Sequence, residues 1–270
     1  MTSSNLEQRV KKMSKNYLKY LIIPDFHAPY EDYRAIQAVY EFAKDWRPDE
    51  IIMMGDHVDF YSLSVFDKNP ERLDGLQKEI DVLHYHLDEM RNFHKGKITY
   101  LEGNHEHRLI RYLWKHPEMN SLRCVNNVPS LLDLDKYDVD YHQNIMRHGV
   151  LFKHGSIVRK HSGYTAKGEL EGEGTSGVSG HTHRMGSHYL TNRSSAHAWY
   201  EMGHICDESK AEYMSGKIAN WQKGFGVMVY DKNANIWNVY QFPIINNSFM
   251  AFNKTYSWRS NAAYPKREDI

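Results

Sequence analysis

The stretch "KITYLEGNHEHR", residues 97 to 108, joins an apolar-leaning run to a dense polar cluster. The first part has the length and pattern of a buried strand. The last six residues, Gly103 to Arg108, add an amide, two imidazoles, a carboxylate and a guanidinium. In open α/β sheets the ligand site lies beyond the carboxyl ends of the strands. The stretch therefore predicts a strand of such a sheet with a functional site at its end.

Four other apolar runs end in polar clusters of the same kind. They are "DFH" (25 to 27), "GDHVD" (55 to 59), "KHG" (153 to 155) and "GHTHR" (180 to 184). One such cluster is usually turn chemistry, but five in succession are hard to explain in that way. Their carboxylate, imidazole and amide groups suit Mn, Fe, Co, Ni or Zn better than Ca or Mg. The clusters together therefore predict a metal site.

Apolar periodicity predicts strands alternating with helices in the first half of the chain. Strands are expected over residues 18 to 23, in the run ending at Gly55 and in "KITYLEGNH"; helices are expected over 33 to 46, 76 to 90 and 108 to 116. Residues 117 to 147 read as an irregular connection before the strand "GVLFKHG". The later runs "VSGHTH", "GSHYL", "AWYEMG", "FGVMVYD" and "NIWNVYQF" predict a mostly antiparallel second sheet. This order of elements favours a layered α/β sandwich.

The motifs D-x-H, G-D-x-x-D, G-N-H-E, an isolated His before Gly, and G-H-x-H follow one another from Asp25 to Arg184, about 60% of the chain. In this order they resemble the calcineurin-like metallophosphoesterase superfamily. The resemblance implies a four-layer α/β/β/α sandwich with two mixed sheets. We expect it to occupy residues 18–258 as a single domain, between a basic N-terminal arm (1–17) and a C-terminal tail (259–270).

The resemblance also implies which residues hold two divalent metal ions. The first ion is assigned Asp25, His27, Asp56 and His183, and the second shares Asp56 and takes Asn104, His154 and His181. Asp59 is expected behind the ligands, where its hydrogen bonds orient them for catalysis. Manganese is the first choice of metal, with Fe, Zn, Ni and Co as alternatives.

The expected chemistry is hydrolysis of a phosphate ester. Two divalent cations and two carboxylates leave a centre of about +2, which attracts a phosphate. Ions roughly 3.5 to 4 Å apart activate a bridging hydroxide, the predicted nucleophile. By the same resemblance, His105 protonates the leaving group or steadies the phosphoryl oxygen, and we expect Glu106 to hold its other ring nitrogen.

Several basic side chains are candidates for substrate binding. Arg108 is expected to bind a phosphate of the substrate, and Arg111 and Arg184 to extend this contact. An equal alternative is that the basic residues of the helix over 108 to 116 lie on an ordinary solvated face and bind no substrate. His107 and His57, which lie inside the motifs, could line the pocket, whereas the helix residues His84, His86 and His94 are expected on the surface. The match of "GEGTSG" (172 to 177) to a dinucleotide fingerprint has the wrong context, before a strand.

Composition narrows the class of protein. Lys+Arg and Asp+Glu are equal at 34 each, which argues against a histone-like binder of polyanions. The two cysteines, Cys124 and Cys206, form no Cys-x-x-Cys pair, so neither a disulfide scaffold nor a thiolate zinc site is expected. No apolar run is long enough for a signal peptide or a membrane span, so we expect a cytoplasmic protein without a membrane partner. The oligomeric state stays open.

These observations favour a binuclear metal-dependent hydrolase of phosphate esters, with a phosphodiesterase or nuclease preferred. Its partner is then a phosphate ester, with nucleic acid and nucleotides as candidates. The alternative is a phosphomonoesterase acting on nucleotides or phosphoproteins. A non-catalytic interaction module on the same fold is the alternative of another class, but such proteins usually lose ligands. Residues 117 to 147 and 190 to 225 carry no motif and are candidate substrate-shaping segments.

Overall fold

The fold is built on two mixed sheets that lie face to face. The computed structural model describes residues 16–69, 72, 74–210 and 219–258. The first sheet has the order β11-β10-β1-β2-β3-β4. Its strands are β1 (Tyr17–Ile23), β2 (Glu50–Met53), β3 (Lys97–Leu101), β4 (Val139–His142), β10 (Gly224–Asp231) and β11 (Ile236–Pro243). Strands β1 to β4 run parallel, whereas β10 is antiparallel to β1 and β11 is antiparallel to β10.

The second sheet has the order β5-β6-β7-β9-β8. Its strands are β5 (Asn144–Arg147), β6 (Val150–Lys153), β7 (Ser176–Ser179), β8 (Met185–Thr191) and β9 (Ala196–Met202). The inner strands β6, β7 and β9 are parallel, and only the edge strands β5 and β8 are antiparallel to their neighbours. The expectation of a mostly antiparallel second sheet is therefore wrong, and two strands predicted for it, β10 and β11, belong to the first sheet. Short apolar runs indicate strands but do not encode which neighbour they pair with.

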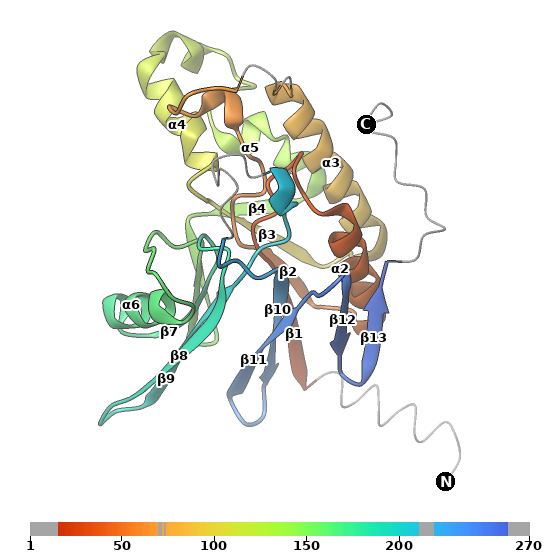
Figure 1. Cartoon of the computed structure of the whole chain (residues 1–270), viewed down its shortest axis with the longest axis vertical. Coiled ribbons are helices and arrows are strands. Elements are labelled where there is room, and N and C mark those ends of the chain that lie inside the picture. Colours follow the sequence, from red (N-terminus) through yellow and green to blue (C-terminus); the bar gives the residue numbers. More distant parts are fainter. Residues whose placement is uncertain (1–15, 70–71, 73, 211–218, 259–270) are drawn as a thin grey trace.

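Helices cover the outer faces of both sheets. They are α2 (Tyr33–Trp46), α3 (Leu76–Phe93), α4 (Glu106–Lys115), α5 (Val128–Leu131) and α6 (Tyr164–Glu173), with short 3-10 turns η1 (Tyr61–Leu63), η2 (Pro117–Ser121), η3 (Leu134–Tyr137) and η4 (Glu208–Lys210). A hairpin of β12 (Ser248–Ala251) and β13 (Lys254–Ser257) packs on α2. Figure 1 shows α6 beyond the second sheet, on the side away from α2 and α3.

Alternation along β1 produces the layers. Leu21 and Ile23 face the cluster formed with the helices α2 and α3, whereas Tyr20 and Ile22 face the second sheet. On the far side of that sheet, a smaller cluster joins α6 to its strands through four buried residues: Leu151, Ala166, Leu170 and Trp199. The molecule is thus a four-layer α/β/β/α sandwich with two mixed sheets, as predicted.

A partly buried ion pair joins the two sheets across their interface. Arg147 of β5 donates from Nε to Oε2 of Glu50 on β2 at 2.9 Å, and from a terminal nitrogen to Oε1 at 2.8 Å. The hydroxyl of Thr99 on β3 donates to the same Oε1 at 2.7 Å. Because the guanidinium is planar, its two parallel contacts fix the register of the sheets as well as their separation.

Some elements escape prediction from the sequence. Helix α6 contains Gly168 and Gly172, which weaken its helical propensity. Strands β4 and β5 lie within residues 117–147, which the sequence predicts to be irregular, and each has only four residues. The run "GEGTSG" is the end of α6, with Gly174 in the left-handed region at φ 66°, followed by β7. His86 and His94 are buried rather than on the surface.

The predicted terminal segments fall largely outside the described residues. This holds for residues 1–15 of the N-terminal arm and for the whole tail, 259–270, while Tyr17 already belongs to β1. Within the described part of the chain, no helix combines the length and the apolar character needed to cross a membrane.

Candidate metal centre

Seven predicted ligands lie beyond the carboxyl ends of five parallel strands. Asp25 and His27 follow β1, Asp56 follows β2 and Asn104 follows β3. From the second sheet, His154 follows β6, and His181 and His183 follow β7. Because the two sheets face each other, these ends meet at one edge of the sandwich.

The first group of candidate ligands comprises Asp25, His27 and His183. One ligand atom of each lies within 4.8 Å of the others, and all three residues are buried. Nε2 of His27 is 3.0 Å from Nε2 of His183, which in turn is 3.4 Å from Oδ2 of Asp25. Oδ1 of Asp25 is buried and has no hydrogen-bond partner among the described residues. Facing ring nitrogens beside a buried carboxylate are a donor set that suits a divalent transition metal.

The second group comprises Asp56, His154 and His181, whose ligand atoms also lie within 4.8 Å of one another. Nε2 of His154 is 3.2 Å from Oδ2 of Asp56 and 3.1 Å from Oδ1 of Asn104. The other ring nitrogen of His154 lies 3.0 Å from the carbonyl oxygen of Met54, to which it can donate. That hydrogen bond leaves the lone pair of Nε2 directed at the carboxylate and the amide, as a metal ligand requires.

The carboxylates and imidazoles of the two groups shift one another's pKa values. Burial alone would raise the pKa of Asp25, but the neighbouring imidazoles His154 and His183 lower it to about 2. Burial opposes a charged His154, yet Asp56 and Asp25 raise the pKa of its imidazole to about 10. A nearby positive charge therefore stabilises the two buried carboxylates, and either a proton on an imidazole or a metal ion can supply it.

The backbone at the site is held in an uncommon conformation. Four of the seven predicted ligands, His27, Asp56, His181 and His183, have φ between 52° and 69°. Residues with side chains seldom adopt this left-handed region, and such strain gathers at functional sites. Gly103 is required for close approach, since a Cβ there would lie 2.2 Å from Oδ1 of Asp56.

The carboxylate of Asp59 contacts two imidazoles, those of His105 and His27. Its Oδ1 lies 3.1 Å from Nδ1 of His105 and 3.4 Å from Nδ1 of His27. Burial would raise the pKa of Asp59, but these two contacts hold it well below its usual range. Arg108 donates to the Asp59 carbonyl oxygen at 2.7 Å and to Nε2 of His105 at 2.9 Å. Because a guanidinium can only donate, Nε2 of His105 is an acceptor here and its proton lies on Nδ1.

Glu106 does not hold His105, so that expectation is wrong. Its buried carboxylate accepts the backbone N–H groups of Asp56 at 2.9 Å and Gly103 at 2.8 Å, and the hydroxyl of Tyr100 at 2.6 Å. The carboxylate therefore ties the loop after β2 to the loop after β3. Glu106 is the first residue of α4, so its side chain turns back under the loops while His105 faces the site.

The predicted substrate residues are spread around the site. A cavity of about 510 Å³ is lined by Asn104, His107 and His154, together with Glu102 and Glu173. Of the described residues, Arg108, Arg111 and Arg184 do not line it. Arg108 instead contacts Asp59 and His105. Arg111 is exposed on α4, and the guanidinium of Arg184 donates to the carbonyl oxygens of Asn220 and Arg159. The substrate contacts expected of Arg111 and Arg184 are thus not directed at this cavity.

His57 is not part of the pocket. Its side chain is fully buried between Phe26 and Tyr100, with ring centroids 4.4 and 5.2 Å away. Neither ring nitrogen has a hydrogen-bond partner among the described residues. Burial lowers the pKa of His57 to about 3, so the ring is neutral at pH 7.

Three residues that support the site were not recognised in the sequence. Glu201 accepts from the hydroxyl of Thr182 at 3.0 Å and so holds the G-H-x-H loop. His204 and Cys206 form a further group of candidate ligands with His183. The signal that could have found them is Gly203–His204, which follows β9 as Gly180–His181 follows β7.

Comparison with solved structures finds only distant likeness. Vps29 from Entamoeba histolytica, as a single mutant, is 12% identical, with a TM-score of 0.46 covering 90% of this chain and 100% of that one. Vacuolar Protein Sorting 29 from Cryptosporidium parvum is 12% identical, with a TM-score of 0.44 covering 88% and 94%. Likeness at this level has no bearing on activity.

Sequence comparison gives a closer relationship. No family model matches the chain. The Gene 54 protein of Mycobacterium phage L5 is 29% identical over 227 residues, which cover 78% of this chain and 88% of that protein. The Gene 54 protein of Mycobacterium phage D29 is 30% identical over 229 residues, which cover 79% and 89%. The chain therefore belongs to the family of the mycobacteriophage Gene 54 proteins.

Proposed function

We propose that this protein is a binuclear metal-dependent phosphoesterase of the calcineurin-like superfamily, acting on phosphodiesters. The observation that carries the proposal is the meeting of two Asp/His groups at strand ends from both sheets: one contains Asp25 and is buried, and the other contains Asp56 and is buried except for the half-buried His181. Asn104 adds a neutral oxygen ligand beside His154. This donor set fits two borderline divalent ions, with manganese as the first choice.

When bound, two such ions would supply a water of lowered pKa and Lewis-acid stabilisation of the phosphoryl charge. The protein's contribution is to hold the ligands rigidly. Asp59 fixes the His27 and His105 rings through their Nδ1 atoms, and the Met54 carbonyl oxygen fixes His154. Each contact directs an Nε2 atom into the site.

His105 and Arg108 act as a pair in this proposal. Arg108 donates to Nε2 of His105, so His105 cannot present a proton from that atom until the guanidinium leaves it. A phosphoryl oxygen between the two side chains would accept from Arg108 and free Nε2. His105 then takes up a proton from solvent at Nε2, which makes the ring an imidazolium, and returns to the neutral ring when it donates this proton to the leaving oxygen. The phosphate contact predicted for Arg108 and the acid role predicted for His105 are thereby linked.

Charge around the cavity favours diesters over monoesters. At neutral pH a diester carries one negative charge, whereas a monoester carries nearly two. Glu102 and Glu173 line the cavity, and the one lysine on its wall, Lys153, is paired with Glu169 at 2.9 Å and Glu173 at 2.7 Å. This wall offers little additional positive charge to a dianion, so the single-charged ester binds at lower electrostatic cost.

The test compares matched substrates on the full-length protein. Protein stripped of metal and reloaded with Mn²⁺ should hydrolyse bis(p-nitrophenyl) phosphate faster than p-nitrophenyl phosphate, and Asp56→Asn should abolish both activities. Single-stranded DNA, RNA and cyclic nucleotides then define the natural class of diester. Activity on the monoester alone would support the phosphomonoesterase alternative. No hydrolysis despite stoichiometric metal would support the non-catalytic module.

A further inference from the structure

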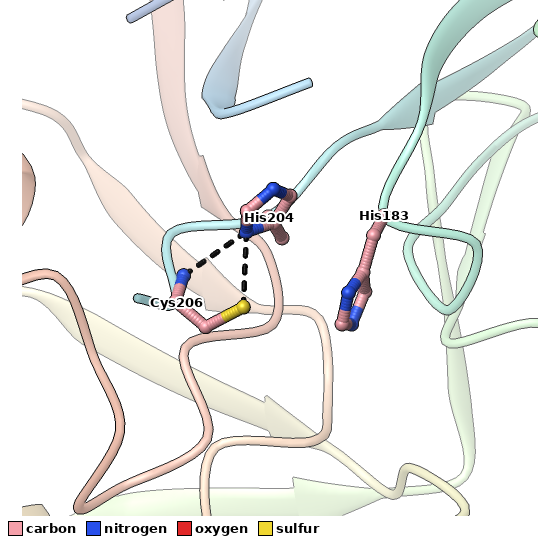
Figure 2. A group of neighbouring side chains, drawn as sticks. All are labelled: His183, His204 and Cys206. Carbon is pink, nitrogen blue, oxygen red and sulfur yellow. Dashed lines mark hydrogen bonds between the residues drawn. The ribbon is translucent and has the colours of Figure 1, made fainter. Parts of the chain in front are cut away.

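A second type of ligand cluster lies directly behind the candidate metal centre. One ligand atom each from His183, His204 and Cys206 lies within 4.8 Å of the others. The residues are 7%, 0% and 5% exposed, respectively. Figure 2 shows Cys206 and His204 on one loop, with the His183 side chain descending beside them from another. The set contains a sulfur, unlike the oxygen and nitrogen ligands of the candidate centre.

The imidazole of His204 presents a lone pair to the sulfur. Its Nδ1 accepts the backbone N–H of Cys206 at 3.2 Å and lies 3.0 Å from Sγ of the same residue. Its Nε2 is 3.3 Å from Oε1 of Glu208. Because Nδ1 accepts an N–H, the ring proton lies on Nε2, near the Glu208 carboxylate, although Nε2 makes no hydrogen bond among the described residues. A carboxylate near the protonated nitrogen of a ligand imidazole is a common feature of metal sites.

His183 supplies an unused nitrogen. Its Nε2 faces Asp25 and His27, but its Nδ1 is buried without a hydrogen-bond partner among the described residues. Buried polar atoms without partners are uncommon and call for an explanation such as an ion. Trp221 covers the two imidazoles, with its ring centroid 4.5 Å from that of His183 and 5.7 Å from that of His204.

Other roles for the thiol fit less well. Burial raises the pKa of Cys206 well above its ordinary value, so a free thiolate nucleophile is disfavoured. The other cysteine, Cys124, is exposed, whereas Cys206 is buried, so the two thiols lie in different environments. A bound metal would stabilise the thiolate that burial alone disfavours.

We propose that His183, His204 and Cys206 form a binding site for a thiophilic divalent cation of the Zn²⁺ class. Three protein ligands leave one position of a tetrahedral ion for water. With bonds of about 2.0 to 2.3 Å, the donor atoms need separations of roughly 3.3 to 3.8 Å. The three donor atoms present lie within 4.8 Å of one another, and Nδ1 of His204 is 3.0 Å from Sγ of Cys206. The inference does not depend on hydrolysis and goes beyond the proposed phosphoesterase.

Binding at this site requires the loss of protons. The thiol of Cys206 gives its proton to solvent, while Nδ1 of His204 already carries a lone pair. A neutral imidazole has one lone pair, so His183 serves this site through Nδ1 and the candidate centre through Nε2 together only as an imidazolate. Affinity for the cation should therefore rise with pH.

Cobalt substitution tests the site on the full-length protein. Metal-free protein titrated anaerobically with Co²⁺ should develop a sulfur-to-cobalt charge-transfer band in the near ultraviolet, and Zn²⁺ should displace it. The band should vanish in Cys206→Ser and persist in the matched control Cys124→Ser. Glu208→Gln should keep the band but weaken Co²⁺ binding by about 10- to 100-fold.

Further variants separate this proposal from the proposed function. Asp56→Asn removes a shared ligand of the candidate centre and should leave the band in place. His204→Gln should remove or shift the band, which provides a second variant if Cys206→Ser does not fold by circular dichroism. Co²⁺ binding to the wild type without a charge-transfer band, or a band lost in Cys124→Ser, would overturn the proposal. Neither outcome bears on phosphoesterase activity.

Discussion

Oδ1 of Asp59 lies 3.1 Å from Nδ1 of His105. Asp59 belongs to the loop after β2, and His105 to the loop after β3, so this contact crosses between neighbouring strand ends. The same oxygen is 3.4 Å from Nδ1 of His27. One carboxylate therefore sets the orientation of a candidate ligand and of the candidate general acid together.

Replacing Asp59 by Asn should impair metal binding and turnover at the same time. The amide of Asn is neutral, so it loses the charge attraction to both rings, and it places an NH2 donor where Oδ2 now contacts the Arg72 guanidinium at 3.3 Å. We expect about a 10- to 100-fold loss in Mn²⁺ affinity and in kcat, measured by calorimetric titration and diester hydrolysis. The exposed Asp88 of α3 provides a control, and equal losses in Asp88→Asn would contradict the interpretation.

His105→Ala should separate chemistry from metal binding. His105 contacts Asp59 and Arg108, and its ring lies beside that of His27 with centroids 4.5 Å apart. We expect metal content to stay at the wild-type level, while kcat falls about 10²- to 10⁴-fold because the general acid is lost. Elemental analysis and steady-state kinetics measure the two effects. An unchanged kcat would rule out the assigned role.

Arg147→Met should destabilise the interface between the sheets. It leaves the carboxylate of Glu50, which is 9% exposed, with the Thr99 hydroxyl but without its cation. Because the Arg147 side chain is 22% exposed, loss of this partly buried pair is expected to cost about 1 to 3 kcal/mol of unfolding free energy, measurable by urea denaturation. The double variant with Glu50→Gln should recover part of this loss, and the exposed Arg193→Met should change little. A single variant as stable as the wild type would contradict the expectation.

His57→Leu should make the protein less sensitive to acid. The pKa of His57 is lowered by burial from 6.5 to about 3, so between these values the unfolded chain binds a proton that the folded chain does not. Its contribution to stability is complete above pH 6.5 and falls as pH decreases, by roughly 2 kcal/mol at pH 5. Urea denaturation at pH 7 and pH 5 should show a smaller difference for His57→Leu. The same pH dependence in both proteins would be the contrary result.

The strand-end positions of the candidate ligands could be predicted from the sequence because each candidate follows an apolar run. A strand and its terminal polar residues are neighbours in the chain, so Asp56 and Asn104 are visible without knowledge of the fold. The resemblance to a known motif series then gave their grouping. The partners of Glu106 were not predictable in this way, because its hydrogen bonds reach Asp56 across 50 positions.

Strand pairing and weak elements were the other sources of error. Strand β10 has the same apolar character as β9, and only the packed fold places it beside β1. Cys206 and His204 are hard to recognise in the sequence, because a single cysteine two positions from a histidine has no distinctive spacing and only the Gly203–His204 pair after β9 points to them. Their association with His183 arises from the meeting of two loops, which local sequence does not encode.

The pairing of β1 with β10 also sets an order of events during synthesis. Asp25 and His27 leave the ribosome early, but β1 lacks one of its two neighbours until β10, residues Gly224–Asp231, has been made. His181 and His183 likewise come after β7. Nascent chains tend to fold from the N-terminus in whole domains. The metal proposed for these residues is therefore expected to bind only after β10 has been made and has paired with β1.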